Sequence, residues 1–487
     1  MNYPVWDVPV LGGAWVIAII AIIHVLISHF AVGGGLFLPM AERRALAQGR
    51  AEWMPLLKRH SRFFLVLTAA AGTVTGVGIW FSIGLGSPAG TSALIHNFVF
   101  VWAIEWVFFL VEITAAAVYY YTWDRVSDKL HLAVGWVYAV SSLWTLIIIN
   151  GILAFMLTPA GAWLDAAGTG DEVRTLWPAF FNAEYWPSLI ARALVAISLA
   201  GTYALVTVSL LDGAKHGDLK ESFARWSSRW VLPGFVLMPI AMGWFVAALP
   251  EGAREILALG VGSAGVGAFT QVTRAALYAA VGSATIAPIV LLLVWRDARH
   301  LRLSHALAVI GLALLTTGAS EMAREMLRKP YVVRGYMYSN GLLEAAVDTP
   351  EERMASYLAN SPWVRPAEAQ AWASPVSSES YQLDRGELMY RGQCMACHTR
   401  DGYRSTRRLL ASRDRDGIQS ILTMLHERPE DSPYNRYMPP LVGTADEIAA
   451  LGDYLFEDTT VARRAYLKKE GLTEDESVAP AEPEAQD

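Results

Sequence analysis

Residues 13–40 read GAWVIAIIAIIHVLISHFAVGGGLFLPM, an apolar run longer than the roughly 20 residues that a helix needs to cross a bilayer. No basic stretch precedes this run and no small-residue cleavage site follows it, so we expect a retained membrane helix and not a signal peptide. Seven further apolar runs follow at about 63–85, 98–123, 132–157, 188–210, 230–250, 274–295 and 304–324. The sequence therefore predicts an all-α protein in which residues 1–335 form a bundle of about eight transmembrane helices.

The composition agrees with a membrane protein. Hydrophobic residues make up 54% of the 487 residues and charged residues only 17%, which is less charge than a soluble chain carries. Eighteen tryptophans and nineteen tyrosines suit the aromatic belts at membrane–water interfaces. The net charge of −6 comes in part from the acidic tail after Glu470. We therefore expect contact with membrane lipid and no nucleic-acid partner.

Basic residues gather in alternate loops between the predicted spans. The first, third, fifth and seventh loops hold fifteen lysines and arginines, whereas the other loops hold only Arg174, Arg254 and Arg274. Because short cytoplasmic loops retain lysine and arginine, we expect the first set of loops to face the cytoplasm. The N-terminus and everything after Pro330 then lie outside. This orientation predicts a bacterial inner-membrane protein whose C-terminal part is periplasmic.

The only two cysteines form the motif Cys394-Met395-Ala396-Cys397-His398. This is the C-x-x-C-H signature of c-type haem attachment, in which both thiols form thioethers to one haem and the histidine ligates its iron. A redox-active cysteine pair is the alternative, but Met438, in Tyr437-Met438-Pro439-Pro440, supplies a second axial ligand for a cytochrome c. Met424 and His426 are weaker candidates because they lie in a helical pattern. Covalent haem c is attached outside the membrane, in agreement with the charge pattern.

Helical patterns flank the haem motif and the methionine loop, and residues 381–460 resemble a class I cytochrome c domain. Residues 336–380 have no long period and contain several turn-forming pairs, so we expect a linker there. Residues 461–487 become charged and then Ala/Pro/Glu-rich, which favours a disordered tail from about 470.

Ionisable side chains inside the predicted spans are candidates for function, because each costs at least ~2.5 kcal/mol at a helix centre. Those in the spans include His24, His29, Glu105, Glu112, Arg192, Glu321, Arg324 and Glu325. At 1.5 Å per residue, His24, Glu105 and Glu325 would all lie in the outer half of the membrane, where histidine and carboxylate can ligate haem b. Glu112 lies two turns beyond Glu105, toward the cytoplasm, where a proton relay would lie. Pattern alone leaves open a hydrogen-bonded core role for His24 and an interfacial ion pair between Glu325 and Arg328.

Several stretches resemble subunit I of cytochrome bd quinol oxidases. They are His24 with Glu42, Gly72-Thr73-Val74-Thr75-Gly76, Ile104-Glu105, Glu112 with Trp123-Asp124-Arg125, Leu143-Trp144 with Asn150-Gly151, and Glu325-Met326-Leu327-Arg328-Lys329-Pro330-Tyr331. The resemblance implies that His24 is an axial ligand in a two-haem active site, that Glu105 lies at the oxygen-reducing haem, and that Glu325 ligates the neighbouring high-spin haem. It further implies a proton-path role for Glu112 and a cofactor-binding role for Arg328, in the family's E-x-G-R-Q-P-W element. The Glu105–Glu112 spacing is one residue shorter than in the family.

Three departures from the family pattern change the expected cofactors. The family binds a low-spin haem b through a His on helix five and a Met on helix seven, but span five has Arg192 at the matching place and span seven has neither residue. The quinol-binding loop shrinks to about 251–273, and the cytochrome c domain replaces the last helix. We therefore expect no low-spin haem and no usual quinol site, and expect Arg192 to hold either a haem propionate or loop carbonyls.

These observations lead to a functional hypothesis with two alternatives. The chain is expected to be a bd-type terminal oxidase subunit that receives electrons through its own haem c and reduces oxygen at one or two membrane haems of b or d type. An external cytochrome c or a redox partner complex would donate the electrons, and the family implies a second membrane subunit. One alternative is a non-oxidase anchor that passes electrons between quinone or cytochrome c and a larger respiratory complex; the other is a subunit that keeps only the haem c.

Overall fold

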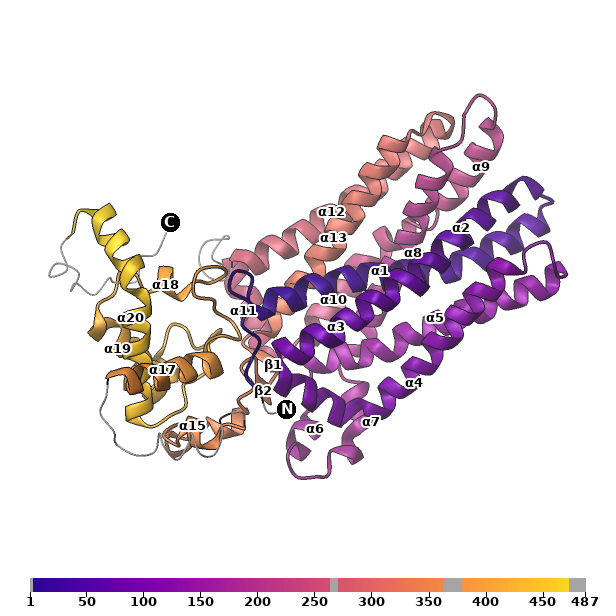
Figure 1. Cartoon of the computed structure of the whole chain (residues 1–487). Coiled ribbons are helices and arrows are strands. Elements are labelled where there is room, and N and C mark those ends of the chain that lie inside the picture. The colour runs from indigo at the N-terminus through magenta and orange to yellow at the C-terminus, as the bar shows by residue number, and fades with distance from the viewer. Residues whose placement is uncertain (1–2, 263–269, 363, 365–378, 473–487) are drawn as a thin grey trace. The chain divides into compact units, whose positions relative to one another are not determined.

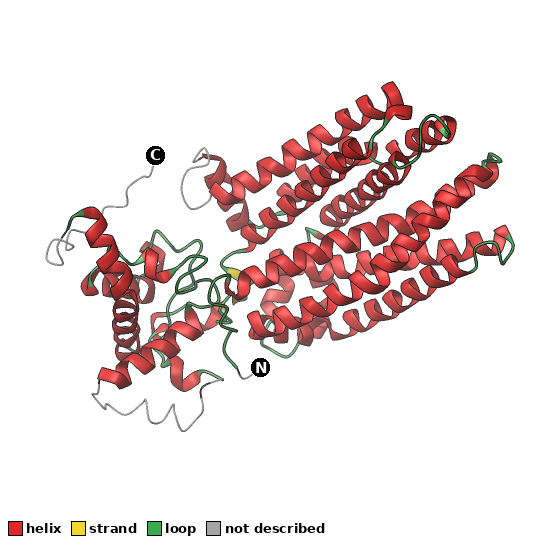
Figure 2. Cartoon of the chain, turned by 45° about the horizontal axis from the view of Figure 1, so that its top comes forward, coloured by secondary structure: helices red, strands yellow, loops and turns green. Residues whose placement is uncertain are grey.

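The computed structural model describes residues 3–262, 270–362, 364 and 379–472 of the chain (Figure 1). Residues 363 and 365–378 of the expected linker, and residues 473–487 of the expected tail, lie outside the described residues. Helices dominate the described part of the chain, where the strands form one small antiparallel sheet (Figure 2). The predicted all-α class is therefore confirmed.

Eight helical segments among the described residues are long and apolar enough to cross a membrane, as the sequence predicts. They are Gly12–Ala47, Ala51–Gly86, Pro88–Tyr121, Asp128–Leu157, Tyr185–Ser209, Gly217–Ala248, Gln271–His300 and Leu303–Arg328. The second span begins before residue 63, where the predicted apolar run starts. Its first part is the amphipathic helix α2 (Met54–Val66), whose basic side chains lower the hydropathy although the helix is continuous. Hydropathy thus predicts the apolar part of each helix but not its polar ends.

The helices of the spans are α1 (Gly12–Ala47), α2, α3 (Thr73–Gly86), α4 (Pro88–Tyr121), α5 (Asp128–Leu157), α8 (Tyr185–Ser209), α9 (Gly217–Ser228), α10 (Leu232–Ala248), α12 (Thr270–Asp297) and α13 (Leu303–Arg328). A π-helical segment, Leu67–Gly72, joins α2 to α3. Shorter helices are α6 (Gly161–Ala166), α7 (Leu176–Phe180) and α11 (Glu251–Gly262). Short 3-10 turns are Ala51–Trp53, Glu172–Thr175, Ala298–His300, Glu344–Ala346 and Pro429–Asp431.

After α13 come the strands β1 (Tyr331–Val333) and β2 (Met337–Tyr338), which pair antiparallel. The remaining helices are α14 (Pro350–Arg353), α15 (Tyr357–Asn360), α17 (Glu379–Gln393), α18 (Thr406–Leu409), α19 (Arg415–Glu427) and α20 (Ala445–Glu470). A capping box fixes the start of α20: the Thr444 hydroxyl accepts a hydrogen bond from the Glu447 amide, and the Glu447 carboxylate accepts one from the Thr444 amide. Gly471, with φ +70°, ends this helix in the left-handed conformation.

The chain divides into two compact units. One contains residues 21–78 and 97–327, and the other contains residues 1–20, 79–96 and 328–487. We call the first the bundle unit and the second the cytochrome-like unit, because the second contains residues 381–460, for which the sequence predicts a cytochrome c domain. In Figure 1 the long helices of the bundle unit run alongside one another.

The core of the bundle unit is rich in aromatic side chains. Phe37 of α1 is fully buried, and its ring lies 4.8 Å from that of Trp226 and 5.0 Å from that of Trp230. Close helix contact elsewhere depends on glycine. A Cβ added at Gly33 of α1 would lie 2.0 Å from the carbonyl oxygen of Ala196 on α8. The absence of a side chain at Gly33 therefore sets the distance between these two helices.

The cytochrome-like unit has its own apolar core. Residues of α17, α19 and α20 form it, among them Met389, Leu422 and Leu451, and Cys394, Cys397 and Met438 pack against it. Helices α17 and α20 cross closely at Gly386, where an added Cβ would lie 2.1 Å from the carbonyl oxygen of Ala450. Both cysteines and the predicted methionine ligand therefore border one apolar cluster.

We predict that Gly33→Ala destabilises the bundle unit, because the methyl group would overlap a backbone oxygen that cannot move without shifting α8. The expected loss is about 1–3 kcal/mol, measured by heat-induced unfolding of the detergent-solubilised chain. Gly243→Ala is the matched control, since an added Cβ there meets nothing within 4 Å. Equal unfolding temperatures for the two variants would contradict the described packing of α1 on α8.

Candidate functional site

The haem motif lies in a tight turn that directly follows α17. The carbonyl oxygen of Tyr390 accepts hydrogen bonds from the amides of Cys394 and Met395, at 2.9 and 3.1 Å. The carbonyl oxygen of Cys394 accepts from the amides of Cys397 and His398, at 3.1 and 3.0 Å. Both cysteines are free thiols, and desolvation raises the pKa of Cys394 to about 12, so that it is protonated at neutral pH. One turn of backbone thus presents two thiols and an imidazole.

A hydrogen bond to the backbone sets the tautomer of His398. Its Nδ1 lies 2.9 Å from the carbonyl oxygen of Arg404, which can only accept, so Nδ1 carries the proton. Desolvation lowers the pKa of His398, which favours the neutral ring. A neutral imidazole protonated at Nδ1 presents the lone pair of Nε2, which is the form that ligates a metal.

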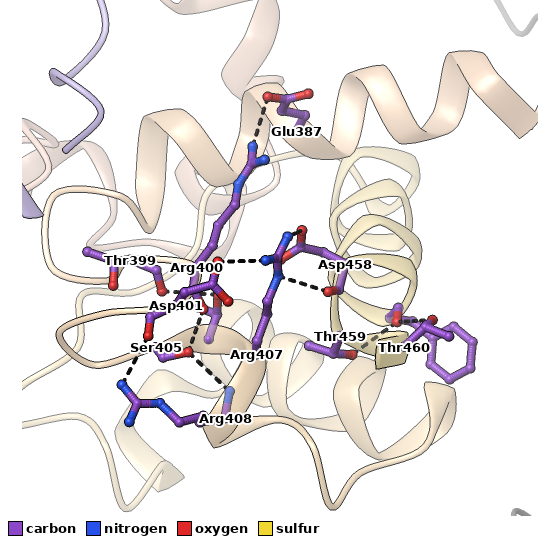
Figure 3. Close-up of polar contacts among 12 residues, drawn as sticks. Glu387, Thr399, Arg400, Asp401, Ser405, Arg407, Arg408, Asp458, Thr459 and Thr460 are labelled. Carbon is purple, nitrogen blue, oxygen red and sulfur yellow. Dashed lines mark hydrogen bonds and ion pairs between the residues drawn. The ribbon is translucent and has the colours of Figure 1, made fainter. Parts of the chain in front are cut away.

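The backbone at Arg404 is strained, with φ +47° in a residue other than glycine. Ion pairs hold the loop around it, residues 399–408, in place (Figure 3). Arg407 binds both carboxylate oxygens of Asp458, at 2.7 and 3.1 Å, and Asp401 at 2.6 Å. Arg400 binds Glu387 at 2.9 Å. These contacts tie the loop to α17 and α20, and so fix the carbonyl that orients His398.

Met438 lies in the loop before α20, partly buried at the edge of the apolar core. Its amide donates to the carbonyl oxygen of Tyr434 at 2.8 Å, which closes a turn of the loop. The competing candidates Met424 and His426 lie in α19, as predicted. His426 is buried, and its Nδ1 donates to the carbonyl oxygen of Leu441 at 3.0 Å. The loop position of Met438 leaves it the better candidate ligand.

A cluster of buried charges lies in the bundle unit. Arg192 of α8 binds the carboxylate of Glu321 of α13 through Nη1 and Nη2, at 2.9 and 3.3 Å. Arg324 binds Glu321 at 3.1 Å and Glu325 at 2.5 Å. The side chains of Arg192, Glu321 and Arg324 are at most 14% exposed, and that of Glu325 is 33% exposed. Glu321 is a partner that the sequence analysis did not propose for Arg192; a role in holding a haem propionate stays a prediction.

Glu184, which the sequence patterns did not predict as a site residue, joins this cluster. It lies in the loop immediately before α8 and is buried, accepts a hydrogen bond from the Thr158 hydroxyl at 3.0 Å, and interacts electrostatically with Arg324 and Arg192. Burial raises its pKa to about 7, although the arginines and Thr158 oppose the shift. The only signal in the sequence was an acidic residue between two aromatic pairs, outside any predicted span.

Hydrogen bonding leaves Nε2 of His24 available as a ligand. Its Nδ1 lies 2.9 Å from the Thr75 hydroxyl, which itself donates to the carbonyl oxygen of Ala71 at 2.7 Å. The hydroxyl must therefore accept from Nδ1, and Nε2 keeps its lone pair. Thr75 follows the π-helical segment Leu67–Gly72, a distortion that often marks functional sites. His29 is fully buried and interacts electrostatically with His24, Arg192 and Glu321, which links His24 to the charge cluster.

Glu105 and Glu112 lie on α4. Glu112 is buried and accepts a hydrogen bond from the Thr145 hydroxyl at 3.4 Å. It interacts electrostatically with Glu105 and Tyr138. Glu105 is partly exposed and makes no hydrogen bond or ion pair with any other described residue. The meeting of His24, Glu105 and Glu325 at one site stays a prediction.

Glu42 belongs to a second buried network that the sequence analysis missed. Its carboxylate lies 2.7 Å from Nδ1 of His131 and accepts from the Tyr119 hydroxyl at 2.6 Å. Nε2 of His131 lies 2.9 Å from the carbonyl oxygen of Tyr119. Both ring nitrogens face acceptors, which is the pattern of a charged imidazolium paired with a carboxylate. This network joins α1, α4 and α5.

Arg328 lies at the end of α13. Its Nη1 donates to the carbonyl oxygens of Tyr331 and Val332, at 3.1 and 2.8 Å, and so shapes the start of the small sheet. The carboxylate of Glu325 pairs with Arg324. The cofactor-binding role of Arg328 stays a prediction.

We predict that Arg192→Ala lowers the free energy of unfolding by about 1.5–3 kcal/mol, the range for a hydrogen bond to a charged group, because a buried carboxylate loses one of its two arginines. Denaturant titration of the purified chain measures this loss. The control is Arg174→Ala, whose pair with Asp171 is 82% and 64% exposed and should contribute about 0–1 kcal/mol. A loss no larger than in the control would show that the buried pair is not formed.

Comparison with known proteins shows what this chain is similar to. Residues 14–249 match the family model for cytochrome bd terminal oxidase subunit I. The structure of bd oxidase from Geobacillus thermodenitrificans is similar to this chain, with a TM-score of 0.57 and 16% sequence identity over 67% of this chain and 88% of that chain. No curated protein matches the sequence. At this identity the structural likeness shows the fold alone, and the family model covers residues 14–249, slightly less than half of the 487 residues.

Proposed function

We propose that this chain is a haem-containing membrane electron-transfer protein, a terminal oxidase-like subunit that receives electrons through its own covalent haem c and reduces oxygen at a membrane haem site. The single observation that carries the proposal is His398, whose Nδ1–H bond to Arg404 leaves Nε2 available in a motif that borders the same apolar core as Met438. The family match of residues 14–249 supports the membrane half of the proposal.

The residues of the haem motif fit a covalent haem c. Cys394 and Cys397 would each add a thiol across a vinyl group. The S–H bond and the π bond of the vinyl group would break as one S–C and one C–H bond form, with no change in electron count. His398 and Met438 would supply the two axial ligands, a combination that raises the reduction potential of cytochromes c. Haem bound at these residues supplies one-electron transfer, and the loop clamped by Arg407 and Asp458 keeps the imidazole of His398 oriented.

In the bundle unit, His24 fits an axial ligand because Thr75 fixes its tautomer. Glu325 would serve as a second ligand, with Arg324 limiting the movement of its carboxylate. Glu105 would lie beside the oxygen-reducing haem, and Arg328 and Arg192 would assist in holding the cofactor. One or two haems of b or d type are the expected cofactors.

Proton supply is the role proposed for Glu112. The carboxyl is buried, hydrogen-bonded to Thr145 and within electrostatic range of Glu105. A buried carboxyl exchanges its proton only with groups that reach it, so Glu112 can accept a proton from the cytoplasmic side and pass it toward Glu105. The partners expected are an external cytochrome c or redox complex and a second membrane subunit, in a bacterial inner membrane with the cytochrome domain periplasmic.

One observation favours a second candidate function. In span five Arg192 is engaged by Glu321, and the apolar stretch 274–295 of span seven carries neither His nor Met. These stretches therefore offer no pair of ligands for a low-spin haem. A chain that lacks the usual quinol route could also act as a non-oxidase anchor subunit, which passes electrons between quinone or cytochrome c and a larger complex.

We predict a carbon monoxide-binding species in the reduced spectrum of the purified chain, because a haem that reduces oxygen must keep one iron position open. His24→Ala or Glu105→Ala should abolish that species, whereas His216→Ala, at an exposed site, should leave it unchanged. Six-coordinate c and b signals that do not respond to carbon monoxide would favour the anchor. A c signal alone would contradict any membrane haem.

We predict that Met438→Ala lowers the reduction potential of the haem c and opens its iron to added ligands, because the thioether would be lost. Redox titration of the c absorption band measures the potential. Met424→Ala is the matched control on α19 and should leave the potential unchanged. An unchanged potential in Met438→Ala would mean that another residue is the axial ligand.

A further inference from the structure

A polar pocket of about 450 Å³ lies in the bundle unit, away from every residue assigned above to a haem or a proton path. It lies where the end of α1, the turn after it, α9 and the 3-10 turn at Ala298–His300 meet. Five arginines line it: Arg44, Arg50, Arg225, Arg229 and Arg299. These residues belong to loops and helix ends that the charge pattern places on the cytoplasmic side.

The positive charge of this pocket exceeds the negative charge that the chain supplies. Glu221 and Asp218 are the acidic residues of the lining. Arg299 binds both at 2.8 Å, and Arg225 binds Glu221 at 2.8 Å. The carboxylate of Glu221 is thus bound by two guanidinium groups, those of Arg225 and Arg299, which shows that the pocket wall can bind a planar anion.

The positive charges of Arg44 and Arg229 are not balanced by a carboxylate among the described residues of the lining. Within the part of the chain that the structure describes, neither forms an ion pair. Nε of Arg44 is buried and has no hydrogen-bond acceptor among those residues. A buried donor without an acceptor is unfavourable, above all when it is charged, because nothing replaces the water that it lost. The pocket is therefore lined by two guanidinium groups that have no ion-pair partner among the described residues and can pair with an anion that enters it.

We propose that this pocket binds a phosphate group, supplied by the headgroup of an anionic phospholipid of the adjacent leaflet. Guanidinium forks match phosphate oxygens two at a time, and several forks converge here. Trp53 and Trp226 also line the pocket, and indole rings favour the level of lipid headgroups. Basic pockets between the ends of membrane helices are suited to such headgroups. A soluble phosphate compound would use the same donors, so the experiment compares both sources.

The test uses the full chain, purified in detergent with its cofactors. Native mass spectrometry counts the phosphatidylglycerol and phosphatidylcholine molecules that each variant retains, and unfolding temperature is measured with each lipid and with inorganic phosphate. Arg44→Gln/Arg229→Gln should bind phosphatidylglycerol at least tenfold more weakly than the unaltered chain. Arg62→Gln/Arg125→Gln, which removes the same charge from exposed positions on the same side, should bind it normally.

Glu221→Gln is a variant for which the expected change in phosphatidylglycerol affinity is an increase and not a decrease. It weakens the hold on Arg225 and Arg299, and should therefore bind phosphatidylglycerol more tightly than the unaltered chain. Equal binding by all four proteins, or an equal loss in the two double variants, would overturn the site. Stabilisation by inorganic phosphate without a preference for phosphatidylglycerol over phosphatidylcholine would overturn the lipid as the source of the phosphate.

Discussion

A charge buried among membrane helices has to find an opposite charge, and this constraint determines how α1, α8 and α13 are organised in the bundle unit. Arg192 and Glu321 meet across α8 and α13, and a hydrogen bond to a charged group contributes about 1.5–3 kcal/mol. Arg324 extends the pair to Glu325, and Glu184 lies within electrostatic range of both arginines. The buried His29 connects this cluster to His24 on the same helix α1.

In the cytochrome-like unit the main constraint is that the imidazole of His398 is held in one tautomer. The carbonyl of Arg404 holds it from a strained backbone position, and the ion pairs of Arg407 with Asp401 and Asp458 keep that backbone in place. The same loop contacts the start of α1 within this unit. The amide of Tyr403 donates to the carbonyl oxygen of Val10 at 2.9 Å, and the Tyr403 ring lies 5.5 Å from that of Trp15. Tyr403, in the segment that follows the C-x-x-C-H motif, is therefore packed against the beginning of α1 within the cytochrome-like unit.

Local patterns were predictable from the sequence and long-range pairings were not. The eight spans follow from apolar runs alone, because each helix satisfies its own backbone hydrogen bonds in lipid. Arg192 and Glu321 lie 129 residues apart, and Glu42 and His131 lie 89 apart, so no local period connects them. Glu184 was not predicted as a site residue because it lies in a loop outside the apolar runs, although the fold buries it. The tautomers of His24 and His398 depend on Thr75 and Arg404, which only the fold brings to them.

The central claim is that one chain carries both a covalent haem on Cys394 and Cys397 and at least one extractable haem among the membrane helices. The most direct measurement is haem stoichiometry by the pyridine haemochrome method, before and after acid–acetone extraction, on the purified full chain. The account predicts one c-type haem that stays with the polypeptide and one or two haems that are extracted. A single porphyrin per chain, whether extracted or retained, would contradict it.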